Sequence, residues 1–186
     1  MTPSLPLVLD ETSLPLSELR SAVLDGDLRQ LGGSYCSIDV HPSKALRALS
    51  LAPLVPDGLV AERMTAAWLH GATTRFRTPL QLCMRSVRRV RAPDSPERVV
   101  RQVVLADTEV VRAGTLLVTH PLRTALDLLR WLPRFDPADA ACVSTLLLGA
   151  GASLQSCRIA LGVAPHLPHK QRALSRLDEV PGFSLR

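Results

Sequence analysis

Residues 98–120 read RVVRQVVLADTEVVRAGTLLVTH, and this stretch determines the fold class because it divides into three strand-like runs. The runs span 98–107, 108–114 and 115–120, are rich in Val and Leu, and are separated by turn residues such as Gly114. A fourth run of the same character, PLQLCMRSV, precedes them at 79–87. We therefore expect three or four strands in a small, mostly antiparallel sheet, within an α+β fold.

The segment after this sheet is predicted to be helical. HPLRTALDLLRW places apolar residues on one stripe and Arg123, Asp127 and Arg130 on the opposite face, where ion pairs would contribute only a few tenths of a kcal/mol. Asp136-Pro137 is a start signal for the next helix, and Ser153 and Pro168 begin two more. These four helices predict a C-terminal helical bundle.

The segment before the sheet begins with a helix and a hairpin. LSELRSAVLDG predicts a helix from Leu16 that ends at Gly26, and residues 28–38 form a hairpin around a Gly-Gly turn. With Arg20 on the helix and Arg29 on the hairpin, this resembles the end of a winged helix-turn-helix, whose helix enters the major groove of DNA. An ordinary αββ corner fits the pattern equally well. Because only fifteen Pro-rich residues precede the helix, we expect a truncated winged-helix-like segment over 1–41 and an α+β domain over 42–186.

Two further helices are expected between the hairpin and the sheet. Residues 42–54 carry apolar side chains predicted to face inward, namely Ala45, Leu46 and Leu49. LVAERMTAAWLHG, at 59–71, has helical spacing and ends at a Gly typical of the position after a helix. Its expected buried stripe consists of Val60, Met64, Ala67 and Trp68.

Positive charge is concentrated in one segment. The chain has 22 basic and 17 acidic residues, a net of +5, but Arg75 to Arg101 alone has eight arginines against Asp94 and Glu97, a net of +6. The candidate phosphate contacts there are Arg88, Arg89 and Arg91, which fall in a predicted loop. A solvated hairpin without a ligand is the alternative. Aromatic residues make up only 3% of the chain, so a stacking platform for single-stranded nucleic acid is not expected.

Catalytic and metal-binding motifs are missing from the sequence. It contains no Gly-rich phosphate loop, GxSxG or HExxH, and neither lysine has the acidic neighbour that restriction-type nucleases use. His166 and His169 have HxxH spacing, but without nearby Cys or carboxylate they are read as loop residues. His70 is expected to interact with the end of its helix. We therefore predict a non-enzymatic protein with no cofactor, no metal and no catalytic residue.

The sequence favours a cytoplasmic protein. The four cysteines are widely spaced with no CxxC pair, as expected of a reduced chain. The first residues, MTPSLPLVLDETS, lack the basic start of a signal peptide, and no apolar run approaches the length of a membrane span.

Three short motifs in order resemble the AbiEi-type antitoxins of type IV toxin–antitoxin (abortive infection) systems, in their actinobacterial form. The first is the Gly-x-Tyr element of the hairpin, Gly33 and Tyr35. The second is the TAAWLHG run, Thr65 to Gly71. The third, V-T-x-P-x-R-T-x-x-D, is matched by Val118, Thr119, Pro121, Arg123, Thr124 and Asp127. The resemblance covers roughly residues 16–178, with a shortened N-terminus and no nuclease-like C-terminal extension.

This resemblance implies a DNA-binding antitoxin and transcriptional regulator. The helix and wing near Arg20 and Arg29 would read double-stranded operator DNA, and the arginine-rich loop would contact the phosphate backbone. A nucleotidyltransferase-type toxin is the implied protein partner, and a homodimer is compatible with the reading. The alternative is a protein-interaction module that binds the product of a neighbouring gene without binding DNA.

Overall fold

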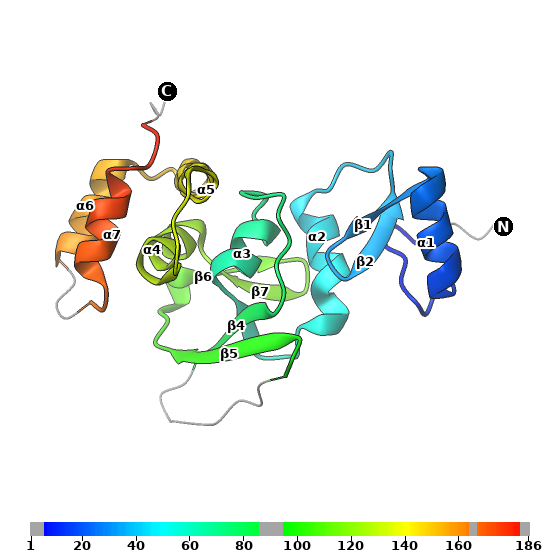
Figure 1. Cartoon of the computed structure of the whole chain (residues 1–186). Helices are drawn as coiled ribbons and strands as arrows, with labels where there is room; N and C mark the ends of the chain where they lie inside the picture. The colour runs from blue at the N-terminus through cyan, green and yellow to red at the C-terminus, as the bar shows by residue number, and fades with distance from the viewer. Residues whose placement is uncertain (1–5, 86–94, 164–166, 183–186) are drawn as a thin grey trace. The chain divides into compact units, whose positions relative to one another are not determined.

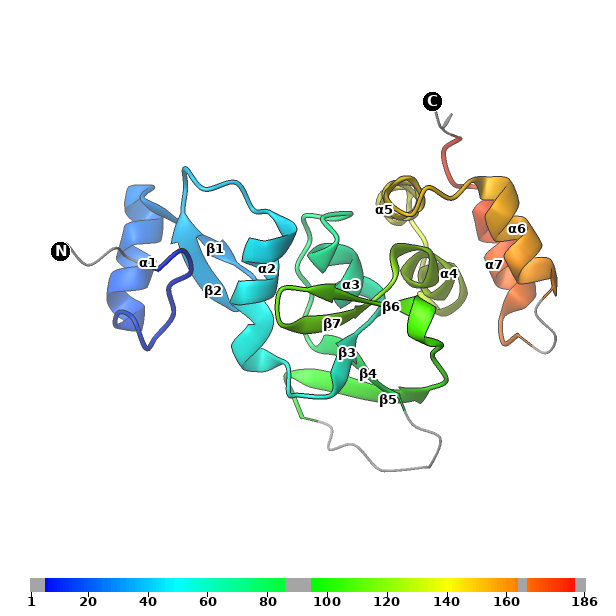
Figure 2. The same cartoon turned by 180° about the vertical axis from the view of Figure 1, so that it is seen from behind.

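A computed structural model of the 186-residue chain describes residues 6–85, 95–163 and 167–182. The chain divides into two compact units, which are treated separately below (Figures 1 and 2). The N-terminal unit comprises Met1–Asp57 with Arg112–Leu116, and the C-terminal unit comprises Gly58–Val111 with Leu117–Arg186. The described residues form an α+β fold with seven α-helices, a two-stranded antiparallel sheet and a five-stranded mixed sheet.

The helix and hairpin predicted at the start of the N-terminal unit are both present. Helix α1 spans Leu16–Asp25 and ends at Gly26, whose φ of 86° is the left-handed conformation that glycine adopts without strain. Strands β1 (Leu28–Leu31) and β2 (Ser34–Ser37) pair antiparallel. Tyr35 of β2 also exchanges two backbone hydrogen bonds of 2.8 Å with Leu9. Leu9, which precedes α1, therefore pairs with the edge of β2 that does not face β1.

Helix α2 (Lys44–Leu51) follows, capped by the Ser43 side chain, which accepts a hydrogen bond from the Leu46 amide. The short 3₁₀ helix η1 (Ala52–Leu54) continues it. Leu46 is buried as expected, but Ala45 and Leu49 are exposed and the prediction for them was wrong. On α1, Leu19 is fully buried, whereas Leu24 is 87% exposed and does not belong to the buried face.

The second sheet has five strands in the order β5-β4-β3-β7-β6. Their bounds are β3 Leu59–Ala61, β4 Leu80–Arg85, β5 Arg98–Val103, β6 Val110–Ala113 and β7 Leu116–Thr119. Of the three or four strands predicted between 79 and 120, four are present, β4 to β7, but the sheet is mixed rather than mostly antiparallel. Strand β3 is antiparallel to β4, whereas the β4–β5 and β3–β7 pairs are parallel.

Two features explain this topology. The connection from β4 to β5 is twelve residues long, residues 86–97, which is about the length that a return to a parallel neighbour requires. The central strand β3 comes from residues that had been assigned to a helix. Its three residues are Leu, Val and Ala, and so short an apolar run does not distinguish a buried strand from a helical turn. The helix itself, α3, begins only at Arg63 and spans Arg63–Leu69.

Helices α3 and α4 lie on the same side of this sheet (Figures 1 and 2). The four predicted C-terminal helices are present as α4 Pro121–Trp131, α5 Pro137–Gly149, α6 Leu154–Val163 and α7 Lys170–Leu177. The predicted start of α5 is confirmed, since Asp136 and Asp139 each accept a hydrogen bond from the other's backbone amide. Ser153 likewise accepts a hydrogen bond from the Ser156 amide at the start of α6.

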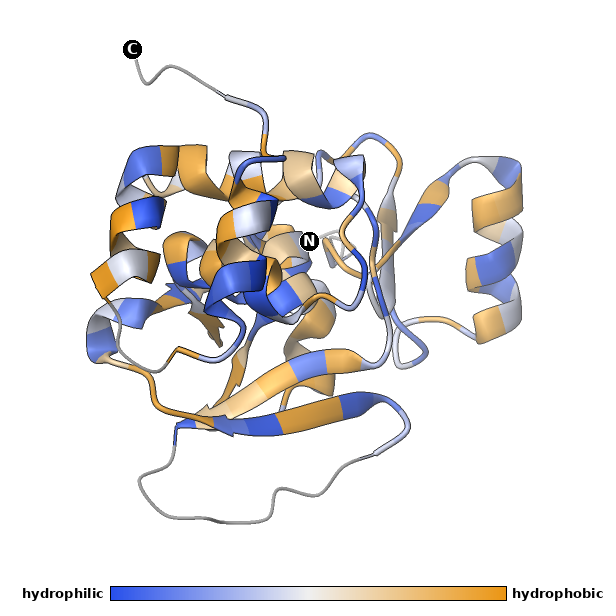
Figure 3. Cartoon of the chain, turned by 60° about the vertical axis from the view of Figure 1, so that its left-hand side comes forward, coloured by the Kyte–Doolittle hydropathy of each residue, from blue (hydrophilic) through white to orange (hydrophobic). Residues whose placement is uncertain are grey.

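One hydrophobic core joins helices α3 to α7. It includes Met64 and Ala67 of α3, Leu128 and Leu129 of α4, and residues of the three later helices such as Leu146, Leu161 and Leu177. Strand β5 alternates between hydrophilic and hydrophobic segments (Figure 3).

Within the described ranges, no single helix has the length and apolar character to cross a membrane. Helices α5 and α6 pass that test only as a pair bent by 92°.

Candidate functional site: an arginine–carboxylate cluster

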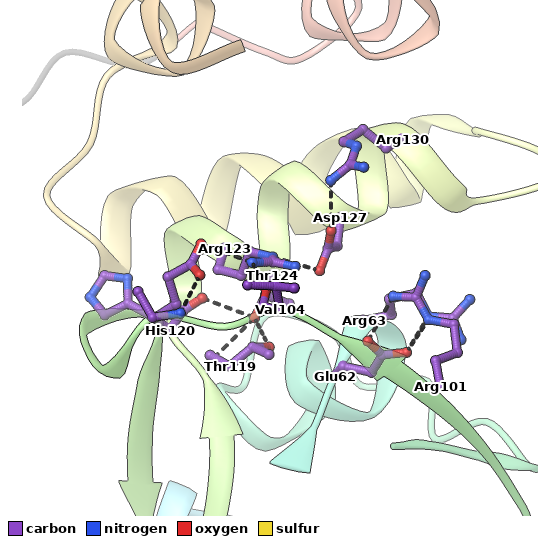
Figure 4. Close-up of polar contacts among 12 residues, drawn as sticks. Glu62, Arg63, Arg101, Val104, Thr119, His120, Arg123, Thr124, Asp127 and Arg130 are labelled. Carbon is purple, nitrogen blue, oxygen red and sulfur yellow. Dashed lines mark hydrogen bonds and ion pairs between the residues drawn. The ribbon is translucent and has the colours of Figure 1, made fainter. Parts of the chain in front are cut away.

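Seven charged side chains of the C-terminal unit form two neighbouring groups of ion pairs, one at the junction of β3 and α3 and one along α4; Figure 4 labels all of them except Glu109. We call this group the arginine–carboxylate cluster. Its members are Glu62, Arg63, Arg101, Glu109, Arg123, Asp127 and Arg130. Four guanidinium groups face three carboxylates, so the cluster has a net charge of +1.

Glu62 is the centre of one half of the cluster. It follows β3 directly, and its side chain is fully buried. Arg101 of β5 donates two hydrogen bonds of 2.7 Å to it, Nε to Oε1 and a terminal nitrogen to Oε2. Arg63 donates a third, from Nε to Oε1 at 3.0 Å. This bidentate pairing compensates the loss of hydration that makes an isolated buried carboxylate so costly.

Asp127 is the centre of the other half. Its side chain, on α4, accepts a hydrogen bond of 2.9 Å from Arg123 Nε and one of 3.2 Å from Arg130. Arg123 also donates to Glu109 at 2.8 Å, which ties α4 to the short 3₁₀ helix η2 (Asp107–Glu109). Arg130 donates from Nε to the Pro168 carbonyl oxygen at 3.0 Å. The predicted pairing of these α4 residues is confirmed, but their expected exposure was wrong, since Asp127 and Arg130 are buried.

The two halves influence each other electrostatically. Burial raises the pKa of Asp127 above its usual value, and Arg123 acts in the opposite direction. Glu62 adds to the rise and Arg101 opposes it. The carboxylates therefore repel each other across the cluster, and the arginines between them are what allow both to be buried.

Arg63 is the least satisfied member of the cluster. Its side chain is only 15% exposed, yet Nε is its one group with a hydrogen-bond partner among the described residues. Burial lowers the pKa of Arg63, Glu62 opposes this, and the positive charge of Arg101 lowers it further. The backbone of Arg63 is also unusual, because its φ of 47° lies in the left-handed region that a long side chain rarely adopts.

Trp131, the last residue of α4, holds two of the arginines in place. The Arg101 Cζ lies 5.1 Å from the centre of the Trp131 ring and the Arg130 Cζ lies 5.6 Å from it, both within cation–π distance. The ring of His169 meets the same indole edge-on, with the ring centres 4.7 Å apart. These contacts give Arg101 and Arg130 defined positions at the partly exposed side of the cluster.

Two buried threonines anchor the start of α4 beside the cluster. The hydroxyl groups of Thr119 and Thr124 lie 2.7 Å apart, and Thr124 also donates to the carbonyl oxygens of Thr119 and His120 at 3.1 Å. His70, at the end of α3, forms a 2.8 Å hydrogen bond between Nε2 and the Thr119 carbonyl oxygen. This contact fixes α3 to the end of β7, a more specific role than the helix-end interaction expected for His70.

The chemistry of the cluster is that of binding. Guanidinium groups donate hydrogen bonds and stay charged, so they bind anions but do not exchange protons near neutral pH. The described part of the chain contains no group of three His, Cys, Asp or Glu side chains able to hold a metal ion. The four cysteines are free and buried, and burial raises the pKa of Cys142 to about 12 and that of Cys157 to about 11.

Neither a scan of protein-family models nor a search of curated proteins finds a match for the chain.

None of the predicted DNA-contacting residues is a member of this cluster. Arg20 is exposed on α1. Arg29 is half-buried; it donates to the Val40 carbonyl oxygen, and its Nε is buried without a partner among the described residues. The loop candidates lie outside the described residues; they are Arg88, Arg89 and Arg91.

Charge is divided unequally between the two units. The C-terminal unit has 17 basic and 10 acidic residues, a net of +7, whereas the N-terminal unit has 5 basic and 7 acidic residues, a net of −2. Part of the basic segment is paired internally. Of the arginines in this segment that the structure describes, four form ion pairs, Arg75 with Asp136, Arg77 with Asp139, Arg85 with Asp107 and Arg101 with Glu62.

Sequence reasoning missed most of the cluster. Glu62 and Arg63 lay within a stretch read as a continuous helix, and Arg101 was counted only as one arginine among eight. One signal could have identified them, namely a charged Glu-Arg pair placed between the apolar residues LVA and MTAAWL. Such a pair inside a buried run needs partners, and the nearby arginine-rich strand was their natural source.

Proposed function

We propose that the protein is a non-enzymatic, DNA-binding regulator of the AbiEi antitoxin type, which contacts the phosphate backbone of its operator through the C-terminal unit. The observation that carries this proposal is the charge of that unit, +7 against −2 for the N-terminal unit. A surface of that sign attracts the phosphate backbone irrespective of sequence. The proposal includes the winged-helix-like character of residues 1–41, a C-terminal helical bundle and a cytoplasmic location.

Within this proposal, the N-terminal unit adds little positive charge for binding the DNA backbone. Arg20 is exposed on α1, but Glu18 and Asp25 are exposed on the same short helix. The guanidinium group of Arg29 already donates a hydrogen bond to the Val40 carbonyl oxygen. The main candidates for phosphate contact are therefore the arginines of the predicted loop, Arg88, Arg89 and Arg91, which lie outside the described residues, with Arg20 as a weaker fourth.

Salt-dependent binding of duplex DNA tests the proposal. Four phosphate contacts give a slope of about −3.6 for log K against log salt, or roughly a hundredfold loss of affinity between 50 and 200 mM. Changing Arg88, Arg89 and Arg91 together to Ala should reduce the magnitude of that slope by about 2.7. The measurement is fluorescence anisotropy with a labelled duplex from the protein's own promoter.

A charge-matched variant controls for net charge alone. Arg134, Arg158 and Arg172 are exposed in the C-terminal unit outside the basic segment, and changing all three to Ala removes the same charge. This control should keep most of the slope. A wild-type protein that does not bind the duplex at 50 mM salt, or whose binding is independent of salt, would contradict the proposal.

A second candidate is supported by a different observation. Ile159 and Val163 lie one turn apart on α6 and are 55% and 78% exposed, so α6 presents apolar surface. In this reading the protein binds a nucleotidyltransferase-type toxin encoded by a neighbouring gene. Co-expression should then recover a complex that Ile159→Glu disrupts and Gln155→Glu, on the same helix, does not. Recovery of the free protein alone would exclude it.

A further inference from the structure

We propose that Arg63, Arg101 and Arg130 form a binding site for a phosphate group on the C-terminal unit (Figure 4). The site is separate from the predicted loop contacts, and it does not depend on whether the protein binds an operator. The steps below concern the donors that are free, the way they are held, and the chemistry of the anion that fits them.

Each of the three guanidinium groups keeps unused donors. Arg63 uses only Nε, which leaves both terminal nitrogens without a partner among the described residues. Arg101 uses Nε and one terminal nitrogen, both on Glu62. Arg130 uses Nε and one terminal nitrogen, on Pro168 and Asp127. Each of the three arginines therefore has at least one terminal nitrogen left to donate to an anion.

These donors are held in place before any ligand arrives. The carboxylate of Glu62 fixes Arg63 and Arg101 side by side, and the Trp131 ring positions Arg101 and Arg130. Side chains restrained in this way lose little conformational entropy when they bind an anion. Their side chains are partly exposed, 15% for Arg63, 21% for Arg101 and 9% for Arg130, so none of the three is fully closed off from solvent.

The backbone of Arg63 argues against a purely structural role. A non-glycine residue in the left-handed region costs stability, and such strain concentrates at functional sites. Asn or Gly at this position would avoid most of that cost. Glu62 would still have its bidentate partner Arg101, so the single hydrogen bond from Arg63 Nε is not what makes its burial feasible.

Phosphate is the anion that suits this donor set best. Planar guanidinium groups pair well with the oxygens of phosphate, which offers more acceptor positions than a carboxylate. The cluster carries one uncompensated positive charge, which favours an anion over a neutral ligand. The phosphate could belong to nucleic acid or to a free phosphate compound, and the experiment below separates these sources.

The test is calorimetric titration of the full chain with inorganic phosphate, with ionic strength held constant by NaCl. Wild type should bind phosphate, and Arg63→Asn should bind it about tenfold more weakly or less, because a charge-assisted donor set has been removed. Asn tolerates the left-handed backbone, so this variant should unfold at the same urea concentration as wild type or a higher one. Arg98→Gln, on the same strand as Arg101, is the matched control and should bind like wild type.

A second measurement uses the unaltered protein. Phosphate should protect Arg63 from modification by phenylglyoxal, read by mass spectrometry, while Arg98 continues to react. Wild type that binds no phosphate beyond the NaCl control, or Arg63→Asn that binds as well as wild type, would overturn the proposal. So would a lack of protection at Arg63.

Labelled duplex DNA then identifies the source of the phosphate. If Arg63→Asn weakens duplex binding and inorganic phosphate competes with the duplex, the site takes a phosphate of nucleic acid. If duplex binding is unchanged while phosphate binding is lost, the site takes a free phosphate compound. If wild type binds phosphate but no duplex, the DNA-binding proposal fails and this one stands.

Discussion

Replacing Glu62 by Gln should destabilise the C-terminal unit more than any other single loss of charge in the cluster. The change keeps the shape of the side chain but removes the charge that Arg63 and Arg101 share. It also places an amide NH₂ where one carboxylate oxygen accepted a hydrogen bond of 2.7 Å, so two donors face each other.

The magnitude follows from the burial of the three side chains. Removing one partner of a buried ion pair costs about 3–5 kcal/mol, because the other charge is left without compensation. Here two arginines lose their partner, but they are 15% and 21% exposed, so water can solvate them in part. We therefore expect a loss near the lower limit, about 3 kcal/mol in the free energy of unfolding.

Urea denaturation followed by tryptophan fluorescence measures this effect selectively. Both tryptophans of the chain, Trp68 and Trp131, lie in the C-terminal unit, so the signal does not report on the other unit. The control is Glu97→Gln, an exposed glutamate of the same unit, which should change stability by less than about 0.5 kcal/mol. Arg101→Met should be costly alone but much less so when combined with Glu62→Gln, with a coupling energy of about 2 kcal/mol.

Two results would refute this reasoning. The first is a loss of less than about 1 kcal/mol for Glu62→Gln, a value typical of exposed ion pairs. The second is simple additivity of the Glu62 and Arg101 substitutions, which would mean that the two side chains do not stabilise each other. Either result would also weaken the case that Glu62 positions Arg63 and Arg101 for a ligand.

Two further predictions concern Asp127 and the end of α1. Burial raises the pKa of Asp127, so the native protein binds a proton at this carboxyl at higher pH than the unfolded chain does. The free energy of unfolding of wild type, relative to that of Asp127→Asn, should therefore rise as the pH falls from 7 towards 4. Urea titrations of both proteins across that pH range measure this difference. A stability difference that is flat or falls with decreasing pH would contradict this. Gly26→Ala should cost about 1 kcal/mol because of the φ of 86°, whereas Gly149→Ala, inside a helix and with open space around it, should not destabilise. Equal thermal stability of these two variants would show that the left-handed backbone at Gly26 is not a constraint.

The sequence predicted which segments are strands better than how they pair. Alternating Val and Leu runs between 79 and 120 identified β4, β5, β6 and β7, because side-chain period is a local property. The parallel pairing of β4 with β5 depends on contacts between residues far apart in the chain. The same is true of β3, whose three apolar residues become the centre of the sheet only when β4 and β7 flank them.

The site was harder to predict than the fold for a related reason. Asp127 and Arg130 are polar residues on the face of α4 opposite its apolar stripe, and such a face normally meets water. Their burial is compensated by opposite charges, because Asp127 pairs with Arg123 and Arg130, and Arg101 also opposes the effect of burial on Asp127. The spacing of residues along α4 predicted the ion pairs of Asp127 correctly. It could not predict that these residues are buried, because that depends on partners from other strands and helices.

The polar residues of the V-T-x-P-x-R-T-x-x-D motif acquire a physical explanation in this structure. Thr119 and Thr124 join the end of β7 to the start of α4, and Arg123 and Asp127 continue into the arginine–carboxylate cluster. In this chain the motif therefore attaches the start of α4 to the end of β7, which is a structural role. The donors that remain free for a ligand belong mainly to Arg63 and Arg101, outside that motif. The proposed phosphate site therefore depends mainly on residues outside this motif, and the Arg63 and Glu62 variants test it directly.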